Sequence, residues 1–357
     1  MTNTLKIAFK SQDLRESLAF VASIVPPNPA QVSYSGVRIQ KKDGGVILTS
    51  NNGDTTIVEE VDAIGNAELD VIIQPRPIIN LLNKTQADDN ITIGITDNKE
   101  LSVSINDRKP YTFKTISTTF PALTVPIDTV IDVSALDLSK ISKILRNSLQ
   151  KDDPVVNVDI NQEFIAFSTT DSYTISYTSS KQKSETPRSI LVPFNVFEKA
   201  AKIKPSRIQV DNNNRVASFI NESTKIITRL ASTAYPPIST IIENTPENSV
   251  QLQTKDPLDI LERISSISTD TPIKVTLKHN LLHIEIENAD VGYGSEQCDI
   301  GKQVQTEISF YIKAQYLMSA LSNNSEVTMS YSGPLQPLHF TSDEVVHNVM
   351  VVMPVRV

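Results

Sequence analysis

The sequence predicts an α+β protein made of three tandem repeats, each with two helices and several antiparallel strands. One series of helical segments carries the repeat, because each segment begins 119 residues after the one before. These segments span residues 74–84, 193–202 and 312–321. A second series, with apolar residues at helical spacing, begins at intervals of 122 residues near Leu14, Leu136 and Leu258. Because the two series keep step along the chain, we expect one structural unit repeated three times.

Proline-marked segments close the three repeats and indicate where the domains end. They lie at residues 120–126, 235–241 and 353–356. A chain of 357 residues is also too long for a single ordinary core. We therefore expect three domains, at residues 1–127, 128–247 and 248–357.

The chain between the helices is predicted to form antiparallel strands. Apolar and polar residues alternate with period two in segments separated by turn-forming clusters. The clearest of these strands are 91–95, 155–160, 273–277 and 282–286, and the turns include 42–45, 97–99 and 212–214. A sheet of this kind leaves edge strands that need a neighbour, which favours sheets that continue from one repeat to the next.

The composition predicts a soluble, cytoplasmic protein without cofactor or metal. No apolar run approaches the roughly 18 residues of a membrane span, and the N-terminus has no signal-peptide pattern. Cys298 is the single cysteine, so an intramolecular disulfide and a multi-cysteine metal site are excluded. His279 and His283 are four residues apart, but the pattern puts them at a turn and on a strand, where they cannot share a metal ion.

Several short motifs, in order and in phase with the repeat, resemble the beta subunit of bacterial DNA polymerase III, the sliding clamp. They are Leu191-Val-Pro193, Phe120-Pro-Ala-Leu123, Thr170-Asp171, Ser332-Gly-Pro-Leu-Gln-Pro337 and the C-terminal Val351-Val-Met-Pro-Val-Arg-Val357. Each motif alone is short. Together with the triple repeat they cover the full chain.

The resemblance implies a head-to-tail homodimer whose six clamp domains close into a ring, with helices lining the hole and sheets forming the wall. Such a protein is a processivity factor without catalytic activity. It encircles double-stranded DNA independently of sequence and tethers the polymerase subunit, the clamp loader and other clamp-motif proteins during replication and repair. A closed ring would also satisfy the strand edges.

The net charge of −8 argues against DNA binding unless the positive charge is segregated. Residues 134–151 are predicted to form a helix with four cations and one aspartate on its polar side, which leaves −11 for the rest of the chain. By charge and by position in the resemblance, the expected DNA-binding residues are Arg15, Asn28, Arg76, Lys84, Lys140, Lys143, Arg146, Lys151, Lys199 and Lys202. Contacts to phosphates would carry no sequence information, as sliding requires.

The resemblance also implies a pocket between the second and third domains for a glutamine-and-leucine-rich peptide. Its residues here would be Val156, Thr170, Ser172, Tyr173, Thr174, Ile175, Pro236, Thr240, Ile241, Pro272, Lys313, Tyr316, Leu335, Pro337, Val351, Val352, Met353, Pro354, Val355 and Arg356. Thr174 and Thr240 stand where many family members have arginine, so the rim has two cationic donors fewer. Pro272 replaces a larger apolar side chain.

For the ring interface the resemblance implies that Tyr111 and Phe113 of one chain meet Ile267 of the other. Burial inside their own domains is the alternative for these three side chains.

Other classes of protein are compatible with parts of the sequence. A repetitive β-rich structural protein would share the strands but not the paired helices, and a clamp of the two-domain type would be shorter. A clamp paralogue with an altered partner pocket would fit the departures. An enzyme is disfavoured, because the chain lacks a phosphate-binding loop, a nucleophile elbow and a zinc-binding histidine pair. Asp152-Asp153 is interpreted as a turn.

Overall fold

The computed structural model describes residues 6–29, 31–121, 129–182, 184, 186–343 and 347–357. Within these ranges the order strand, helix, four strands, helix, three strands occurs three times, with one short strand added in the first repeat. The predicted α+β class and the six predicted helices are confirmed. The proposed boundary at 127/128 and most of the proline-marked segment 120–126 lie outside the described residues. None of the described helices is long and apolar enough to cross a membrane.

The first repeat runs from β1 to β9. Its elements are β1 (Ile7–Lys10), α1 (Ser11–Ala22), η1 (Val32–Tyr34), β2 (Val37–Lys42), β3 (Gly45–Asn51), β4 (Thr55–Asp62), β5 (Ile64–Gly65), β6 (Asp70–Ile73), α2 (Pro75–Leu82), β7 (Asn90–Ile95), β8 (Leu101–Ile105) and β9 (Tyr111–Phe113). The short β5 is the addition that the other two repeats lack among their described residues.

The second repeat runs from β10 to β17 and is followed by a short helix. Its elements are β10 (Thr129–Asp132), α3 (Leu138–Leu145), η2 (Arg146–Ser148), β11 (Val155–Ile160), β12 (Ile165–Thr170), β13 (Thr174–Ser180), β14 (Arg188–Pro193), α4 (Phe194–Ile203), β15 (Arg207–Val210), β16 (Val216–Ile220), β17 (Thr224–Arg229) and then α5 (Ser239–Glu243).

The third repeat completes the chain. Its elements are β18 (Asn248–Gln253), α6 (Lys255–Ser265), β19 (Ile273–Lys278), β20 (Leu281–Asn288), β21 (Gly292–Asp299), β22 (Ile308–Ile312), α7 (Ala314–Leu321), β23 (Glu326–Tyr331), β24 (Leu338–Ser342) and β25 (His347–Val352).

Strands of different repeats pair to form two eight-stranded sheets. The first has the order β10-β15-β16-β17-β4-β3-β2-β6, and the second has the order β14-β11-β12-β13-β25-β24-β23-β18. In the first sheet β17 pairs with β4, and in the second β25 pairs with β13 in the same antiparallel way. The position of β4 in its repeat is that of β13, and the position of β17 is that of β25. The same kind of junction therefore occurs twice within the chain.

Two smaller sheets hold the remaining strands. Their orders are β5-β1-β7-β8-β9 and β21-β20-β19-β22. Strand β9 is the first repeat's counterpart of β17 and β25, and β21 is the third repeat's counterpart of β4 and β13. Both β9 and β21 lie at sheet edges. The two halves of a third junction are therefore present in the chain, and among the described residues the outer edge of each strand is unpaired.

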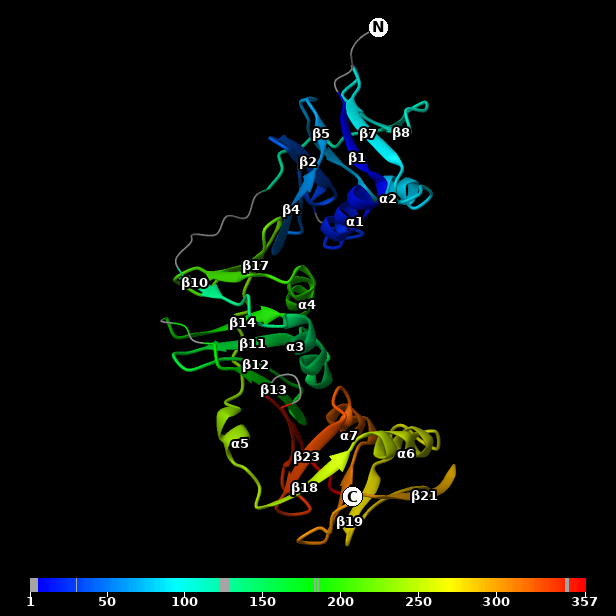
Figure 1. The fold of residues 1–357 in the computed structure, drawn as a ribbon, viewed down its shortest axis with the longest axis vertical. Helices are drawn as coiled ribbons and strands as arrows, with labels where there is room; N and C mark the ends of the chain where they lie inside the picture. The colour runs from blue at the N-terminus through cyan, green and yellow to red at the C-terminus, as the bar shows by residue number, and fades with distance from the viewer. Residues whose placement is uncertain (1–5, 30, 122–128, 183, 185, 344–346) are drawn as a thin grey trace. The chain divides into compact units, whose positions relative to one another are not determined.

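The chain forms two compact units, residues 1–135 with 203–230 and residues 136–202 with 231–357. Each unit contains one eight-stranded sheet and one smaller sheet. In Figure 1, α1 and α2 pack side by side in the first unit, and α6 and α7 do so in the second. A contact between the hydroxyls of Ser11 and Thr85 joins the start of α1 to the chain after α2.

Helix α3 is shorter than predicted. The sequence pattern predicts a helix over residues 134–151, but the structure has α3 at Leu138–Leu145, then a 3-10 turn to Ser148 and an extended Leu149. The Asp137 carboxylate caps the start by accepting from the Lys140 N–H at 3.1 Å. The fully buried Ser148 hydroxyl lies 2.8 Å from that of Ser176, which fixes the chain where the helix would continue. Lys151 consequently lies beyond the helix.

Candidate nucleic-acid and partner surfaces

Helices α3 and α4 lie side by side (Figure 1). Together they present a basic surface. The Ser139 hydroxyl donates to the Ala201 carbonyl oxygen at 3.0 Å and ties the two helices together. Leu138, Ile141 and Leu145 of α3 are buried at 0–2 % exposure, so the opposite face of the helix meets solvent. That face carries the exposed Lys140, Lys143 and Arg146, and α4 adds Lys199 and Lys202.

Acidic side chains neutralise only part of this surface. Lys140 Nζ lies 3.7 Å from Asp137, and Arg146 pairs with Glu198 while its guanidinium carbon lies 5.7 Å from the centre of the Phe194 ring. Five cations against two carboxylates leave +3 on the two helices.

The other three lysines of this surface have no acidic partner. Across the described ranges, no carboxylate lies within salt-bridge distance of Lys143, Lys199 or Lys202. Partial burial and the neighbouring Lys202 ammonium lower the pKa of Lys199. An anion such as a phosphate relieves this crowding of like charge.

The other predicted DNA-binding residues are more dispersed. Arg15 lies on α1, between Asp13 and Glu16, and Arg76 lies on α2. Asn28 is exposed in the chain after α1, and Lys84 is exposed in the chain after α2. Lys151 is exposed in the turn before β11. The positive charge is therefore concentrated on the helices of the second repeat rather than shared equally among the three.

A partly exposed aromatic pair marks the second predicted surface. The rings of Tyr173 and Tyr316 stack, and the Lys313 ammonium lies 5.6 Å from the centre of the Tyr316 ring. Asp171 holds the loop that presents Tyr173, because its carboxylate accepts from the N–H groups of Tyr173 at 3.0 Å and Thr174 at 2.6 Å. Burial, followed by the negative charge of Asp171, raises the pKa of Tyr316.

The C-terminal strand and the segment after it run past this aromatic pair. In the β13–β25 ladder, Thr174 lies opposite Val352. The Met353 N–H then donates to the Tyr173 carbonyl oxygen at 2.9 Å, and the Val355 N–H donates to the Tyr311 carbonyl oxygen at 2.8 Å. The structure thus brings together the predicted residues of the β12–β13 loop, of α7 and of 351–356.

Helix α5 contributes apolar residues to the neighbouring part of the sheet. Ile238 and Ile242 pack against a small apolar cluster of Ile175, Val349 and Val351. The predicted pocket residues Thr240 and Ile241 lie on the same helix and are exposed.

A cavity of about 190 Å³ lies against the chain that leads into α5. We call it the Tyr235 cavity. Two of its lining residues, Thr170 and Pro236, are predicted pocket residues. The other lining residues, which the sequence pattern did not assign to a site, are Gln150, Asp152, Asp153, Val155, Thr233, Ala234 and Tyr235. Burial raises the pKa of Tyr235 to about 12. A proline-marked segment gives no periodic signal, so nothing in the sequence pattern could have placed Tyr235 against the turn of Asp152.

Some predicted pocket residues lie beneath the surface. Val156, Thr174 and Val352 are 0–1 % exposed, so their side chains lie in the interior and are out of a partner's reach in this conformation.

Three further predicted pocket residues lie in connecting segments of the third repeat. Leu335 is 47 % exposed and Pro337 half-buried in the loop before β24. Pro272 is half-buried directly before β19.

The predicted interface residues lie at or near the two unpartnered strand edges. Tyr111 is 52 % exposed on β9, and Phe113 is half-buried and lines a cavity of about 220 Å³ with Gln74 and Pro77. Ile267 is half-buried, and a Cβ atom on Gly294 of β21 would lie only 2.6 Å from its Cδ1 atom. Gly294 therefore leaves room for Ile267 to cover β21.

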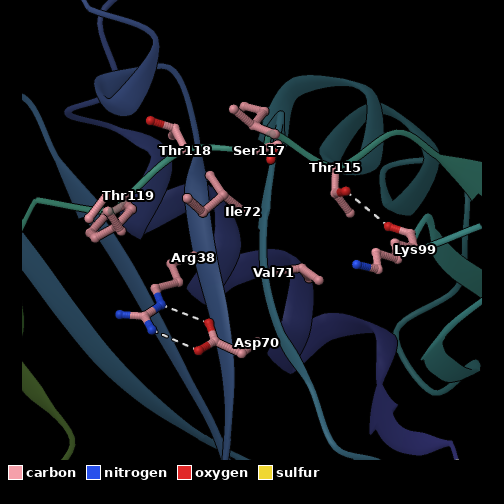
Figure 2. Close-up of a pocket in the computed structure, with 11 residues that line it drawn as sticks. Arg38, Asp70, Val71, Ile72, Lys99, Thr115, Ser117, Thr118 and Thr119 are labelled. Atoms are coloured by element: carbon pink, nitrogen blue, oxygen red, sulfur yellow. Dashed lines mark hydrogen bonds and ion pairs between the residues drawn. The ribbon is translucent and has the colours of Figure 1, made fainter.

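Figure 2 shows a cavity of about 460 Å³ in the first repeat, which contains none of the predicted site residues. It lies beside β6 and the segment 115–120, with Lys99 at one end and Arg38 at the other. Two hydrogen bonds of 2.7 and 2.8 Å join the Arg38 guanidinium to the Asp70 carboxylate and hold the pKa of Asp70 below its usual value. Since these two charges neutralise each other, that end offers little net charge to a ligand.

The chain resembles known proteins in both its sequence and its fold. Residues 5–124 match a family model described as the DNA polymerase III beta subunit, N-terminal domain. A protein named beta sliding clamp from Rickettsia felis is 22 % identical over 386 residues, which cover 99 % of this chain and 100 % of the relative. The beta sliding clamp of Bacillus subtilis is 20 % identical over 398 residues, with the same coverage.

Solved structures show the same fold. The DNA polymerase sliding clamp of Bacillus subtilis superposes with a TM-score of 0.87 at 16 % identity, covering 99 % of this chain and 100 % of that one. A sliding clamp of Pseudomonas aeruginosa bound to griselimycin gives 0.87 at 15 % identity with the same coverage.

Proposed function

Since this chain belongs to the family of bacterial DNA polymerase III beta subunits, we propose that it is a DNA sliding clamp that encircles duplex DNA and tethers the replicative polymerase. The observation that carries the proposal is the repeated strand junction. The chain makes it twice, between β4 and β17 and between β13 and β25, and retains one half of a third junction at β21 and the other at β9. A second copy of the chain supplies the missing strand to each edge.

We propose a head-to-tail homodimer on this basis. Pairing β21 of one copy with β9 of the next would repeat the junction already used inside the chain, and two such pairings close a ring without leaving an unpaired edge. The exposed Tyr111 on β9 and Ile267 beside β21 would lie at these pairings. Domains at residues 1–127, 128–247 and 248–357 would give this ring six similar parts.

The basic surface of α3 and α4 would face the DNA. Lys143, Lys199 and Lys202 are the cations best placed to attract phosphates, because no carboxylate in the described chain neutralises them. Contacts of lysine with phosphate are independent of base sequence, so the duplex could move through the ring. Arg15, Arg76, Lys84 and Lys151 would add attraction from more dispersed positions. The attraction of Lys140 and Arg146 would be weakened by their acidic partners.

The surface around Tyr173, Tyr316 and residues 351–356, here called the peptide surface, would receive the clamp-binding peptides of the polymerase subunit, the clamp loader and other partners. An extended peptide could place apolar side chains against the tyrosine pair, α5 and Met353, with backbone groups at the rim as polar contacts. The protein would act without catalysis or cofactor, in the cytoplasm where the replication machinery works.

Retention on circular DNA tests the proposed function. Loaded by its cognate clamp loader, the protein should stay on a nicked circular plasmid through gel filtration and leave when the plasmid is cut once, because a ring is held by topology. Sedimentation should give the mass of two chains at micromolar concentration. A monomer that is not retained on circular DNA would refute the proposal.

A further inference from the structure

The Tyr235 cavity adjoins the proposed peptide surface. Thr170 lines the cavity, and its hydroxyl donates to the Thr174 carbonyl oxygen at 2.7 Å and accepts from the Ser172 N–H at 3.2 Å. The wall of the cavity and the loop that carries Tyr173 are therefore one connected piece of backbone. A peptide lying against Tyr173 can extend a side chain past Thr170 into the cavity.

The cavity has the size and the walls for one long side chain. Its volume of about 190 Å³ is below the roughly 300 Å³ at which pockets for whole small molecules begin. Val155, Ala234, Pro236 and the ring of Tyr235 supply an apolar wall, which suits the methylene stem of a side chain.

The charged side chains that line the cavity in the described part of the chain are all negative. Asp152 and Asp153 are the only charged residues that line it in the described part of the chain, and both are exposed. Neither forms an ion pair with any segment that the structure describes. Lys151, the neighbouring cation in sequence, is not among the lining residues. The turn has a defined backbone conformation, since Asp153 has a left-handed φ of 44° shortly before β11.

The loop beside Thr170 has the same sign, and the two cations of the peptide surface, Lys313 and Arg356, do not line the cavity. Asp171 adds a third carboxylate beside Thr170, and Thr174 and Thr240 supply no positive charge. The ammonium of Lys313 is held over the Tyr316 ring. An apolar wall with an acidic rim matches a side chain that has an apolar stem and a cationic end.

We infer that this cavity binds a lysine or arginine side chain of the partner peptide, with the stem against Val155 and Pro236 and the cation between Asp152 and Asp153. This assignment rests on the proposed function. It adds that the peptide surface selects partners with a basic side chain. Partners of this clamp would carry a basic residue beside the apolar part of their motif.

Fluorescent peptides that share one glutamine-and-leucine-rich motif test the inference by anisotropy. At each flanking position in turn the peptide carries lysine, arginine, norleucine or glutamate, and norleucine keeps the stem without the charge. At one position we expect lysine and arginine to bind about fivefold more tightly than norleucine, and glutamate more weakly. The preference should shrink between about 50 mM and 500 mM salt.

The double variant Asp152→Asn/Asp153→Asn should lose the preference and keep its affinity for the norleucine peptide. The matched control is Asp97→Asn/Asp107→Asn, which removes the same charge from turns of the first repeat and should leave the preference intact. Equal binding of lysine and norleucine at every position, or a preference that survives in Asp152→Asn/Asp153→Asn, would overturn the inference alone. Failure of every peptide to bind the unaltered protein would overturn the peptide surface as well.

Discussion

Tyr173 stacks on Tyr316, with ring centroids 6.4 Å apart and planes inclined by 19°. Tyr173 comes from the loop between β12 and β13 of the second repeat, and Tyr316 comes from α7 of the third. Tyr173 is 58 % exposed, so the stack presents an aromatic face to solvent. Aromatic faces of this kind supply much of the binding energy in peptide recognition.

Replacing Tyr316 by alanine should weaken peptide binding about tenfold or more, because it removes one ring and leaves Tyr173 without its support. Tyr316→Phe should bind nearly normally, since the ring does the stacking. Anisotropy of a labelled clamp-motif peptide measures both, and Tyr34→Ala in the first repeat is the control. Normal affinity of a folded Tyr316→Ala would exclude the stack from the binding surface.

Removing Lys143 and Lys202 together should reduce the slope of log affinity for DNA against log salt concentration by roughly two, close to one for each phosphate that is no longer neutralised. Titration of labelled duplex over a range of salt concentrations measures this slope. Lys274→Ala/Lys278→Ala removes the same charge from β19 and should leave the slope unchanged. A slope that falls equally in both double variants would show that only total charge matters.

Tyr111→Asp should dissociate the proposed dimer, because it places a charge on the β9 edge proposed to pair with β21. We expect the dissociation constant from sedimentation equilibrium to rise at least about tenfold. Ile64→Asp is the control, since Ile64 is 83 % exposed on β5 at the opposite edge of the same sheet. An unchanged dimer in Tyr111→Asp would argue that β9 does not form the interface.

His339 should make the fold less stable as the pH falls. It is 4 % exposed on β24, and burial lowers its pKa below the ordinary value of 6.5. Between these two values the unfolded chain binds a proton that the folded chain does not, so stability is lost as the pH falls through 6.5.

The slope from this one group is at most about 1.4 kcal/mol per pH unit. Urea unfolding at several pH values measures it. His339→Gln should flatten the decline, whereas His347→Gln, which removes an exposed histidine, should not. Identical declines in the unaltered protein and His339→Gln would contradict the prediction.

The repeat was predictable from sequence because helix starts depend on local signals. Apolar residues at helical spacing marked three of the six predicted helices, the constant interval of 119 residues marked the other three, and period-two alternation marked strands such as β7 and β19. The end of α3 was not predictable, since a hydrogen bond between Ser148 and the distant Ser176 fixes it. Helix α5 was missed because its β-branched sequence Ser-Thr-Ile-Ile-Glu favours a strand, and packing of Ile238 and Ile242 on the sheet decides otherwise.

The candidate basic surface was predictable in part for the same reason. Helical periodicity predicts the basic face of α3. The structure differs from this prediction at Lys151, which lies in a turn because the helix is shorter than predicted. The cavity with Asp152 and Tyr235 joins segments about eighty residues apart and so leaves no pattern in either. Strand junctions such as that of β4 with β17 were also not predictable, because strands paired across more than 160 residues carry no local sequence signal of the pairing.

The recurrence of one strand junction has a further consequence for how such a ring can be divided into polypeptides. If six repeats close the circle, each boundary between repeats is stereochemically the same whether a peptide chain crosses it or not. One long chain of six repeats, two chains of three or three chains of two would all satisfy the same edges. Subunit number is then a matter of where genes begin and end, and the circumference stays constant.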